Sequence, residues 1–385
     1  MRYDAEVVVI GAGPAGSRAA ERLAAAGHDV LLLERRKSLG EPVCCTGIIS
    51  RECFSRFDID PAWVLRSYSG ARLHAPGGNV IDVRRSSVQA VAVDRAAFDR
   101  SLAEKAVASG SRLLLGTTAI NIETNSGAAI IDVVQQGEHR RLIARAAVIA
   151  AGLSPRLTRA LGLGQVSDAA LGFQLEVETI EPVEVEVFLG RGIAPGFFAW
   201  LAPVADNRAK IGLIARRRAD ANLQRLVESL RSQGKIGRTV GEIRCRAIPL
   251  STLPRTYTDR ILVVGDAAGQ VKSTTGGGLY YGLVCADLAA ETLHRSLITD
   301  NLSTAALSVY QRRWRQVLGR DQILGRFARN IFQRFSDRQV DRLLLRAENS
   351  GLIDRLLGDE SLTFDRHGKA IVRSAGSLLP AALGW

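Results

Sequence analysis

The chain begins with a short apolar run, a helical pattern and a second apolar run. Residues 7–10 are Val-Val-Val-Ile, and such an unbroken β-branched run predicts a strand buried on both faces of a parallel sheet. Residues 15–26 are rich in Ala, Leu, Glu and Arg and predict a helix. Residues 29–33 predict a second strand, which ends at Glu34. Together these segments predict a parallel β-α-β unit.

The turn between the first strand and the helix carries three spaced glycines. Gly11 allows a tight turn, Gly13 lets the backbone approach a diphosphate, and Gly16 lets the helix pack against the strand. The diphosphate would meet free N–H groups and the positive end of the helix dipole. Glu34, 23 residues after Gly11, is placed to accept hydrogen bonds from an adenosine ribose. A turn used only for packing would not explain Glu34, so we predict a dinucleotide site.

A second glycine-rich stretch, residues 265–278, follows another apolar strand at 261–264. Asp266 ends that strand and can hydrogen-bond a polyol such as a ribityl chain. Gly276-Gly277-Gly278 opens a helix predicted over 279–298, where bare N–H groups suit the edge of a flavin that gains negative charge on reduction. The alternative is a glycine hinge before a core helix. The two stretches together predict one long ligand held at both ends, with FAD as the natural candidate.

The remaining pattern predicts an α/β fold with a Rossmann-like FAD-binding domain, an antiparallel-sheet substrate lobe and a C-terminal helical region. Apolar and polar residues alternate with period two between 172 and 214, which is typical of a half-buried antiparallel sheet. The predicted domains are a discontinuous FAD-binding domain over 1–69, 94–165 and 245–300, a substrate lobe over 70–93 and 166–244, and helices over 301–385. Further predicted elements are a small sheet inserted in the FAD-binding domain at 70–93, a helix at 96–109, a hairpin at 113–134, a strand at 148–152, a helix at 222–232 and a strand at 243–250.

Length and composition agree with a two-lobed enzyme. At 385 residues the chain exceeds what one core usually serves, and its 46% hydrophobic and 23% charged content is ordinary for a globular protein. The first apolar run is too short for a secretory signal. The uncharged stretch 273–286 is too short to span a bilayer. We therefore expect a cytoplasmic protein.

The five cysteines contain no C-x-x-C pair, so the sequence predicts no metal site and no disulfide framework. Cys245 and Cys285 lie in apolar settings and are predicted to be inert core residues. Cys44 lies in a loop bounded by Gly and Pro, where it is either a bystander or a site thiol. It would form a thiolate only if nearby positive charge lowers its pKa.

The segment 310–346 holds ten Arg and three Asp on a helical pattern, in a chain of net charge +12. One interpretation is a solvated helical cap packed on the FAD-binding domain. The other is a basic amphipathic region lying on an anionic membrane, peripheral on its inner face. The positive charge would also attract a small acidic electron carrier such as ferredoxin or flavodoxin. No recognition motif for nucleic acid is present, so we expect no nucleic-acid partner.

Four further features carry a family resemblance. They are Arg95-Ala96-Ala97-Phe98-Asp99, Gly265-Asp266-Ala267-Ala268 with Thr275-Gly276-Gly277-Gly278, Pro42-Val43-Cys44-Cys45-Thr46-Gly47, and Phe198-Ala199-Trp200-Leu201-Ala202-Pro203. They resemble the R-x-x-F-D, GDAA…TGGG, P-x-x-C-x-x-G and Y-x-W-x-F-P motifs of the geranylgeranyl reductase family. This family belongs to the FAD-dependent oxidoreductases of the p-hydroxybenzoate hydroxylase-like fold. The resemblance covers about residues 6–293.

The chain departs from the family pattern at four positions. Phe198 replaces Tyr and Ala202 replaces Phe, which removes a hydroxyl proton donor and widens the pocket. Cys45 replaces Gly, and Ala151 replaces an Asp before Gly152. The resemblance therefore implies a flavin reductase but leaves its prenyl substrate open.

What the resemblance implies is the saturation of isoprenoid carbon–carbon double bonds by hydride transfer from FAD. Cys44 and Trp200 are the catalytic candidates, and the prenyl-lipid substrate would contact Phe197, Phe198, Trp200 and Pro203. The expected cofactor-binding residues are Gly11, Gly13, Ala15, Gly16, Glu34, Arg35, Cys45, Gly47, Arg95, Gly152, Gly265, Asp266, Gly276, Gly277 and Gly278.

Three questions stay open at this level. No second G-x-G-x-x-G follows a strand, so the electron donor is either NAD(P)H or a small acidic redox protein. The same fold serves flavin-dependent monooxygenases. The absence of any Lys between Lys37 and Lys105 argues only against the halogenases among them. A non-catalytic flavoprotein or lipid carrier is the other alternative.

Overall fold

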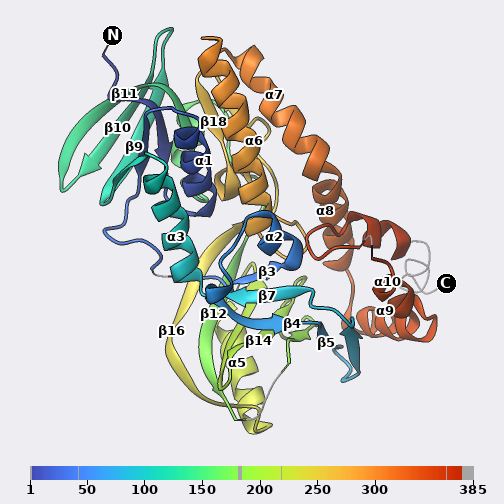
Figure 1. Cartoon of the computed structure of the whole chain (residues 1–385). Coiled ribbons are helices and arrows are strands. Elements are labelled where there is room, and N and C mark those ends of the chain that lie inside the picture. The colour runs from blue at the N-terminus through green and yellow to red at the C-terminus, as the bar shows by residue number, and fades with distance from the viewer. Residues whose placement is uncertain (1, 42, 181–183, 218, 361, 375–385) are drawn as a thin grey trace. The chain divides into compact units, whose positions relative to one another are not determined.

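The computed structural model describes residues 2–41, 43–180, 184–217, 219–360 and 362–374. The chain divides into two compact units, each built from three separate stretches (Figure 1). The first, here called the cofactor unit, spans Met1–Val43, Arg95–Asp168 and Pro249–Arg320. The second, here called the sheet unit, spans Cys44–Asp94, Ala169–Ile248 and Asp321–Trp385.

The cofactor unit is built on an eight-stranded sheet whose central strands are parallel. Its main path runs β17 (Tyr257–Thr258), β18 (Ile261–Val263), β11 (Glu138–Ile149), β1 (Ala5–Ile10), β2 (Val30–Leu33) and β8 (Arg112–Leu114), and the antiparallel strands β9 (Thr117–Thr124) and β10 (Ala129–Gln135) extend from β11. Its helices are α1 (Pro14–Ala25), α3 (Arg95–Ala108), α4 (Pro155–Ala160), α6 (Leu279–Ile298) and α7 (Thr304–Trp314), with a 3-10 turn η2 (Gly265–Ala268) and a π-helical turn η3 (Arg315–Gly319).

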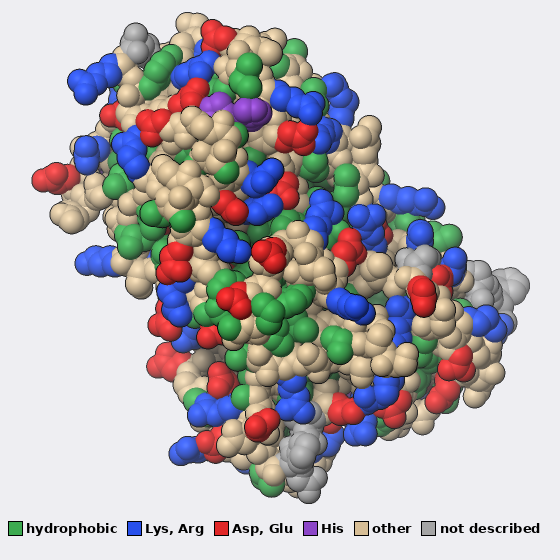
Figure 2. Space-filling model, in the orientation of Figure 1, with side chains coloured by type: hydrophobic (Ala, Val, Ile, Leu, Met, Phe, Trp, Pro, Cys, Tyr) green, Lys and Arg blue, Asp and Glu red, His purple; other side chains and the backbone are tan. Residues whose placement is uncertain are grey.

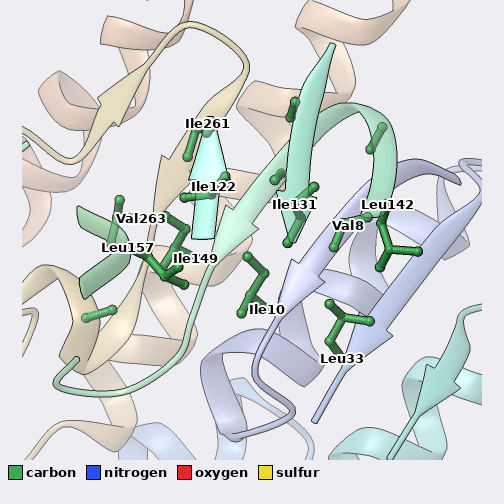
Figure 3. Close-up of a cluster of buried hydrophobic side chains, with 14 of the residues drawn as sticks. Val8, Ile10, Leu33, Ile122, Ile131, Leu142, Ile149, Leu157, Ile261 and Val263 are labelled. Carbon is green, nitrogen blue, oxygen red and sulfur yellow. The ribbon is translucent and has the colours of Figure 1, made fainter. Parts of the chain in front are cut away.

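Both faces of the parallel strands are covered, which explains their unbroken apolar runs. Helix α1 packs against α3 and α6 on one face. On the other face, Val8, Ile10 and Leu33 meet Ile122 and Ile131 of the β9–β10 hairpin, as Figure 3 shows. Because β1, β2, β11 and β18 run parallel, the turns that follow them all leave the same edge of the sheet.

The sheet unit contains two sheets. The larger is ordered β16 (Ile236–Pro249), β12 (Ala169–Thr179), β15 (Arg208–Ala215), β14 (Ala199–Ala205), β13 (Glu186–Phe188), β5 (Gly70–His74) and β6 (Val80–Arg84); the smaller is β3 (Ile48–Ser50), β7 (Ala90–Val93) and β4 (Val64–Tyr68). Helix α5 (Ala219–Ser232) packs against β12 and β15. The other helices assigned to the unit are α2 (Arg51–Arg56), the short turn η1 (Pro61–Trp63), α8 (Arg320–Phe332) except for its first residue, α9 (Asp337–Asn349) and α10 (Leu352–Leu357).

The C-terminal helices divide between the two units. Phe335, Val340 and Leu344 pack on Ala75 and Ile81 of the β5–β6 hairpin. In the cofactor unit, α7 is fixed by buried hydrogen bonds from Trp314 Nε1 to Thr256 Oγ1 (3.0 Å) and from Thr256 N to Gln311 Oε1 (2.8 Å).

Several boundaries therefore differ from those drawn on the sequence. Residues 44–69 lie in the sheet unit and 301–320 in the cofactor unit. The predicted small sheet at 70–93 is wrong as drawn, because β5 and β6 extend the larger sheet while β7 pairs with β3 and β4. The last strand of the sheet unit begins at Ile236 rather than 243. Within the described residues, no helix has the length and apolar character needed to cross a membrane.

Candidate functional site

The first glycine turn closes β1 tightly against β11 and α1. Gly11 has φ +106°, and a Cβ there would lie 2.6 Å from the carbonyl oxygen of Ala150. A Cβ on Gly16 would lie 1.8 Å from the carbonyl oxygen of Gly11. Gly13, in contrast, has nothing within 4 Å of its Cβ position. Gly11 and Gly16 are therefore required by packing, whereas Gly13 borders open space.

The N-terminus of α1 faces this space without a side-chain cap. Gly13 is its N-cap residue, Pro14 occupies its first turn, and no acidic residue lies there. The first N–H groups of a helix have no partner within the helix, and they carry partial positive charge. This end of α1 is thus suited to a diphosphate.

Glu34 lies directly after β2, half-buried, with both carboxylate oxygens engaged. Its Oε2 accepts from Ala12 N and its Oε1 from Arg36 N, each at 3.0 Å. Each oxygen keeps further acceptor capacity, so Glu34 can hold the glycine turn and still bind a pair of ribose hydroxyls. Arg35, beside it, is exposed.

The second glycine stretch is supported by a buried network. Gly265, with φ +65°, donates its N–H to Gln270 Oε1 at 2.8 Å, and Gln270 Nε2 donates to Tyr310 Oη at 2.8 Å. The hydroxyl of Tyr310 donates to the carbonyl of Val263 at 3.0 Å. Helix α7, which carries Tyr310, therefore fixes the shape of the turn after β18.

The triple glycine closes around Asp266 and Lys272. A Cβ on Gly278 would lie 2.9 Å from Asp266 Oδ1, and one on Gly277 would lie 2.6 Å from Lys272 Cε. The loop is held by hydrogen bonds from Lys272 N to Gly277 O (3.0 Å) and from Gly276 N to Lys272 O (2.8 Å). Gly278 is the N-cap of α6, with no side-chain cap and no acid in the first turn. A carboxylate, a buried lysine and a helix N-terminus thus share one loop.

The two glycine stretches meet in the cofactor unit. The Cβ of Ala15 lies 3.0 Å from the position of a Cβ on Gly265 and 3.5 Å from one on Gly282 in α6. One turn further along, Arg18 Nε is 2.7 Å from Asp287 Oδ1. Two segments about 250 residues apart in sequence therefore form one edge, as expected of turns that follow parallel strands.

Two other predicted cofactor residues belong to this unit. Arg95 begins α3, is buried, and forms an ion pair with Asp99 at 2.9 Å. The loop after β2 approaches it closely, since a Cβ on Gly40 would lie 2.5 Å from Ala96 O. Gly152, after β11, has φ +68°. These residues, with the two glycine stretches and Glu34, fit an FAD: the chain offers an uncapped helix end for the diphosphate, a carboxylate for the ribose, and a donor-rich glycine loop.

The sheet unit presents a separate candidate site around Trp200. The indole of Trp200, on β14, covers Gly212 of β15: a Cβ on Gly212 would lie 2.4 Å from Trp200 Cζ2. Phe198 lies beside it, with ring centroids 5.9 Å apart. The Trp200 Nε1 atom is buried and has no hydrogen-bond partner among the described residues. Buried indole N–H groups usually have a partner, so this donor is available to a ligand.

The cysteine loop is tied to the same face of the sheet. Lys210 Nζ donates to Cys45 O at 3.1 Å, and Thr46 Oγ1 donates to Gln174 Oε1 at 2.8 Å. Strand pairing places Lys210 and Gln174 on the face of Trp200, because Gln174 and Trp200 both pair with Gly212 and Lys210 lies two residues from it. Gly47, with φ +85°, ends the loop and donates its N–H to Cys45 Sγ at 3.4 Å.

Burial raises the pKa of the Cys44 thiol to about 11, the nearby Cys45 thiol adds to the shift, and Arg246 opposes it. Cys44 therefore keeps its proton at neutral pH and is suited to donate one rather than to act as a thiolate. Cys285 is buried, as predicted, but the prediction that Cys245 is a core residue is wrong. Cys245 is exposed, because its strand β16 lies at the edge of the larger sheet.

The other two predicted substrate residues, Phe197 and Pro203, are buried. Pro203, by the alternation along β14, points to the opposite side from Trp200, and its carbonyl accepts from the Tyr68 hydroxyl. Phe197 precedes β14 and is buried with the guanidinium of Arg216 5.8 Å from its ring. Phe198 and Trp200 are the two predicted aromatic residues whose rings are in contact at this candidate site.

Sequence reasoning missed three residues of these sites. Lys272 is the only charged residue between Asp266 and Asp287, and that isolation in an uncharged stretch was its available signal. Gly212 lies within a strand, where glycine often marks a close approach. Lys210 gives no local signal, because its role depends on a loop 165 residues away.

The solved structure of a geranylgeranyl bacteriochlorophyll reductase-like protein from Thermoplasma acidophilum resembles this chain with a TM-score of 0.87 at 21% identity. The match covers 98% of this chain and 97% of that one. This confirms the predicted fold class: the protein has the α/β fold of FAD-binding oxidoreductases.

Sequence comparison narrows the class. A family model described as lycopene cyclase protein matches residues 6–348. A digeranylgeranylglycerophospholipid reductase of Methanocaldococcus jannaschii is 30% identical over 350 residues, covering 88% of this chain and 89% of that protein. Digeranylgeranylglycerophospholipid reductase 2 of Methanopyrus kandleri is 31% identical over 401 residues, covering 99% of both. The chain belongs to the geranylgeranyl reductase family of FAD-dependent oxidoreductases, as its motifs predicted.

Proposed function

We propose that this protein reduces carbon–carbon double bonds of a geranylgeranyl-type isoprenoid chain with FAD bound in the cofactor unit. The observation that carries the proposal is the packing of Ala15 against Gly265, because it joins two glycine stretches that separately suit the two ends of one dinucleotide. The names of the relatives support a prenyl lipid as the class of substrate.

In this proposal, separate parts of the cofactor unit bind the two ends of FAD. The N-terminus of α1 with Gly11 and Gly13 would hold the diphosphate, and Glu34 the adenosine ribose. Asp266 and the loop 276–278 would hold the ribityl and flavin end, where the N–H groups and Lys272 favour negative charge. Bound FAD, once reduced by two electrons from the electron donor, would supply the hydride that reduces the double bond and would return to its oxidised form.

The sheet unit would bind the lipid. Phe198 and Trp200 offer an apolar surface for the prenyl chain, and the unpaired Trp200 Nε1 offers one hydrogen bond to a polar group of the substrate. Cys44 would donate the proton from Sγ. Since a thiol with a pKa of about 11 is a weak acid, that proton would move together with formation of the C–H bond at the neighbouring carbon. Solvent would then restore it.

We also propose that electrons reach the enzyme from NAD(P)H or from a small acidic redox protein, and that the lipid is met at an anionic membrane surface. The net charge of +12, with Lys and Arg side chains spread over the face that Figure 2 shows, supports either an acidic carrier or an anionic surface, since both are attracted by the same field.

The test is anaerobic reoxidation of the dithionite-reduced protein by a panel of lipids. The panel holds a digeranylgeranyl phospholipid, geranylgeranyl diphosphate and a prenyl quinone, and product masses are measured. Reoxidation with two hydrogens gained per double bond supports the proposal. Product that forms only with oxygen and a reduced nicotinamide would indicate a monooxygenase. A flavin that no lipid, quinone or oxygen reoxidises would indicate a non-catalytic relative.

Three variants separate the two parts of the proposal. Asp266→Ala should loosen the flavin, whereas Trp200→Ala should impair turnover and leave flavin content intact. Trp200→Phe keeps an aromatic ring and removes only the N–H, so it reports the value of the hydrogen bond. If the Trp200 variants lose flavin to the same extent as they lose turnover, the role of Trp200 is structural only.

A further inference from the structure

Helix α8 presents an apolar pair to solvent. Ile323 is 63% exposed and Phe327 is 60% exposed, and they lie one turn apart on the same face. The opposite side of the helix is buried through Gln322, Gly325 and Arg329. A helix of a globular protein normally turns its bulky apolar side chains inward. The last turn of α8 does so with Ile331 and Phe332, whereas its first part exposes an isoleucine and a phenylalanine.

Two arginines accompany this pair. Arg326 lies next to Phe327 on α8, and Arg334 follows the end of the helix by two residues; both are exposed. The single acid within 315–335, Asp321, is half-buried and accepts a hydrogen bond from Gly368 N at 2.6 Å.

We propose that this surface, formed by Ile323, Arg326 and Phe327 of α8 with Arg334 just after the helix and here called the α8 face, docks on an anionic lipid bilayer. Ile323 and Phe327 would enter the boundary between headgroups and acyl chains, while the guanidinium groups bind lipid phosphates. Contact rather than spanning is required, since no described helix could cross a membrane. The apolar pair distinguishes a bilayer from a small acidic protein, because attraction to an acidic carrier needs the arginines but not two exposed apolar side chains.

This inference deepens the proposed function, since it names the surface at which a lipid substrate would be met. It can nevertheless be tested without turnover. The protein is incubated with vesicles of phosphatidylcholine, with or without phosphatidylglycerol, and the bound fraction is measured by flotation at low and high salt. Wild type should bind the anionic vesicles and be released partly by salt, because salt screens the arginines.

The decisive variant is Ile323→Gln with Phe327→Gln. Both residues are exposed, so folding should be retained, and thermal unfolding checks this. We expect at least a tenfold weaker partition into anionic vesicles, about 1.4 kcal/mol, at every salt concentration. Arg326→Gln with Arg334→Gln should weaken binding at low salt only. Ile298→Gln is the matched control, since Ile298 is 68% exposed on α6, and it should bind like wild type.

Several outcomes would overturn the inference. They are no binding of wild type to anionic vesicles at low salt, unchanged binding by the double Gln variant, or an equal loss in the Ile298 control. A dimer in solution that the double Gln variant dissociates would assign the face to a second copy of the chain. If wild type does not bind vesicles but reduces soluble geranylgeranyl diphosphate, the membrane inference is wrong and the proposed function stands. If wild type binds vesicles but reduces no lipid, the proposed function is wrong and the membrane inference stands.

Discussion

Gly13 and Gly16 lie three residues apart, yet the structure gives them different jobs, which a pair of alanine substitutions should separate. An Ala at 16 would place its Cβ 1.8 Å from the backbone oxygen of Gly11. An Ala at 13 meets nothing within 4 Å and keeps an ordinary φ of −74°. We expect Gly16→Ala to destabilise the fold and Gly13→Ala to weaken cofactor binding alone.

The magnitudes follow from these contacts. In Gly16→Ala the two atoms must separate by about 1.2 Å to reach the 3.0 Å below which Cβ contacts essentially never occur, and backbone shifts of this kind cost ~3 kcal/mol, the upper end of the usual range for overpacking. In Gly13→Ala, the alanine loses ~0.5 kcal/mol or more as a helix N-cap and gains a similar amount by restricting the unfolded chain, so stability should change by under ~1 kcal/mol. Its methyl group would occupy the approach of the diphosphate, and we expect at least a tenfold higher Kd for FAD, about 1.4 kcal/mol.

The assays are urea unfolding of the apoprotein and FAD titration followed by quenching of flavin fluorescence. Gly192→Ala is the matched control, because its Cβ also meets nothing within 4 Å but it lies in the sheet unit, and it should alter neither quantity. An apoprotein with Gly16→Ala as stable as wild type, or a Gly13→Ala variant with unchanged FAD affinity, would refute the reasoning.

Three other predictions concern ionisable groups. Lys272→Met removes a buried cation from the glycine loop. It should lower the midpoint potential of the bound flavin by ~30 mV, equivalent to about 1.4 kcal/mol for a two-electron couple. Spectroelectrochemistry tests this with Lys369→Met as the control, and equal shifts in both variants would contradict it. Because burial raises the pKa of Cys44 to about 11, iodoacetamide should label it at pH 8 more slowly than exposed Cys245, as mapped by peptide mass spectrometry. Faster labelling of Cys44 would contradict the conclusion that its thiol keeps its proton. Burial by itself raises the pKa of Glu186, but the hydrogen bonds and charges of His74 and Lys235 lower it by more, so the pKa lies below its usual value. The ion pairs of Glu186 should therefore stabilise the protein above about pH 4.3, the ordinary value, and be lost as pH falls through the lowered pKa. Urea unfolding across this range should show a shallower acid loss for Glu186→Gln, and an unchanged slope would count against the pairing.

The β-α-β start and the late glycine stretch could be predicted because their signals are local. A positive φ at Gly11, a bare helix end after Gly13 and an acid after β2 all lie within 34 residues. The meeting of the two glycine-rich stretches could also be expected, because the turns that follow parallel strands lie at the same edge of the sheet. The substrate side was harder. The cysteine loop is held by Gln174 and Lys210, 128 and 165 residues away, and no local pattern reveals such partners.

The face that a helix buries was equally hidden from sequence. Ile323, Leu324, Phe327 and Ile331 form an apolar series at helical spacing, yet α8 leaves two of them in solvent. A 3.6-residue period shows that apolar side chains form a stripe along the helix. Which side of the helix is buried depends on the elements that pack against it. The same reason explains Cys245, whose apolar strand lies at a sheet edge.

The absence of a side chain at Gly212 determines where the indole of Trp200 lies. Because the indole packs directly on that backbone, one methyl group there would displace the ring. In the proposed function, a substitution at Gly212 would therefore change which prenyl chains are accepted, although Gly212 itself lies beneath the indole.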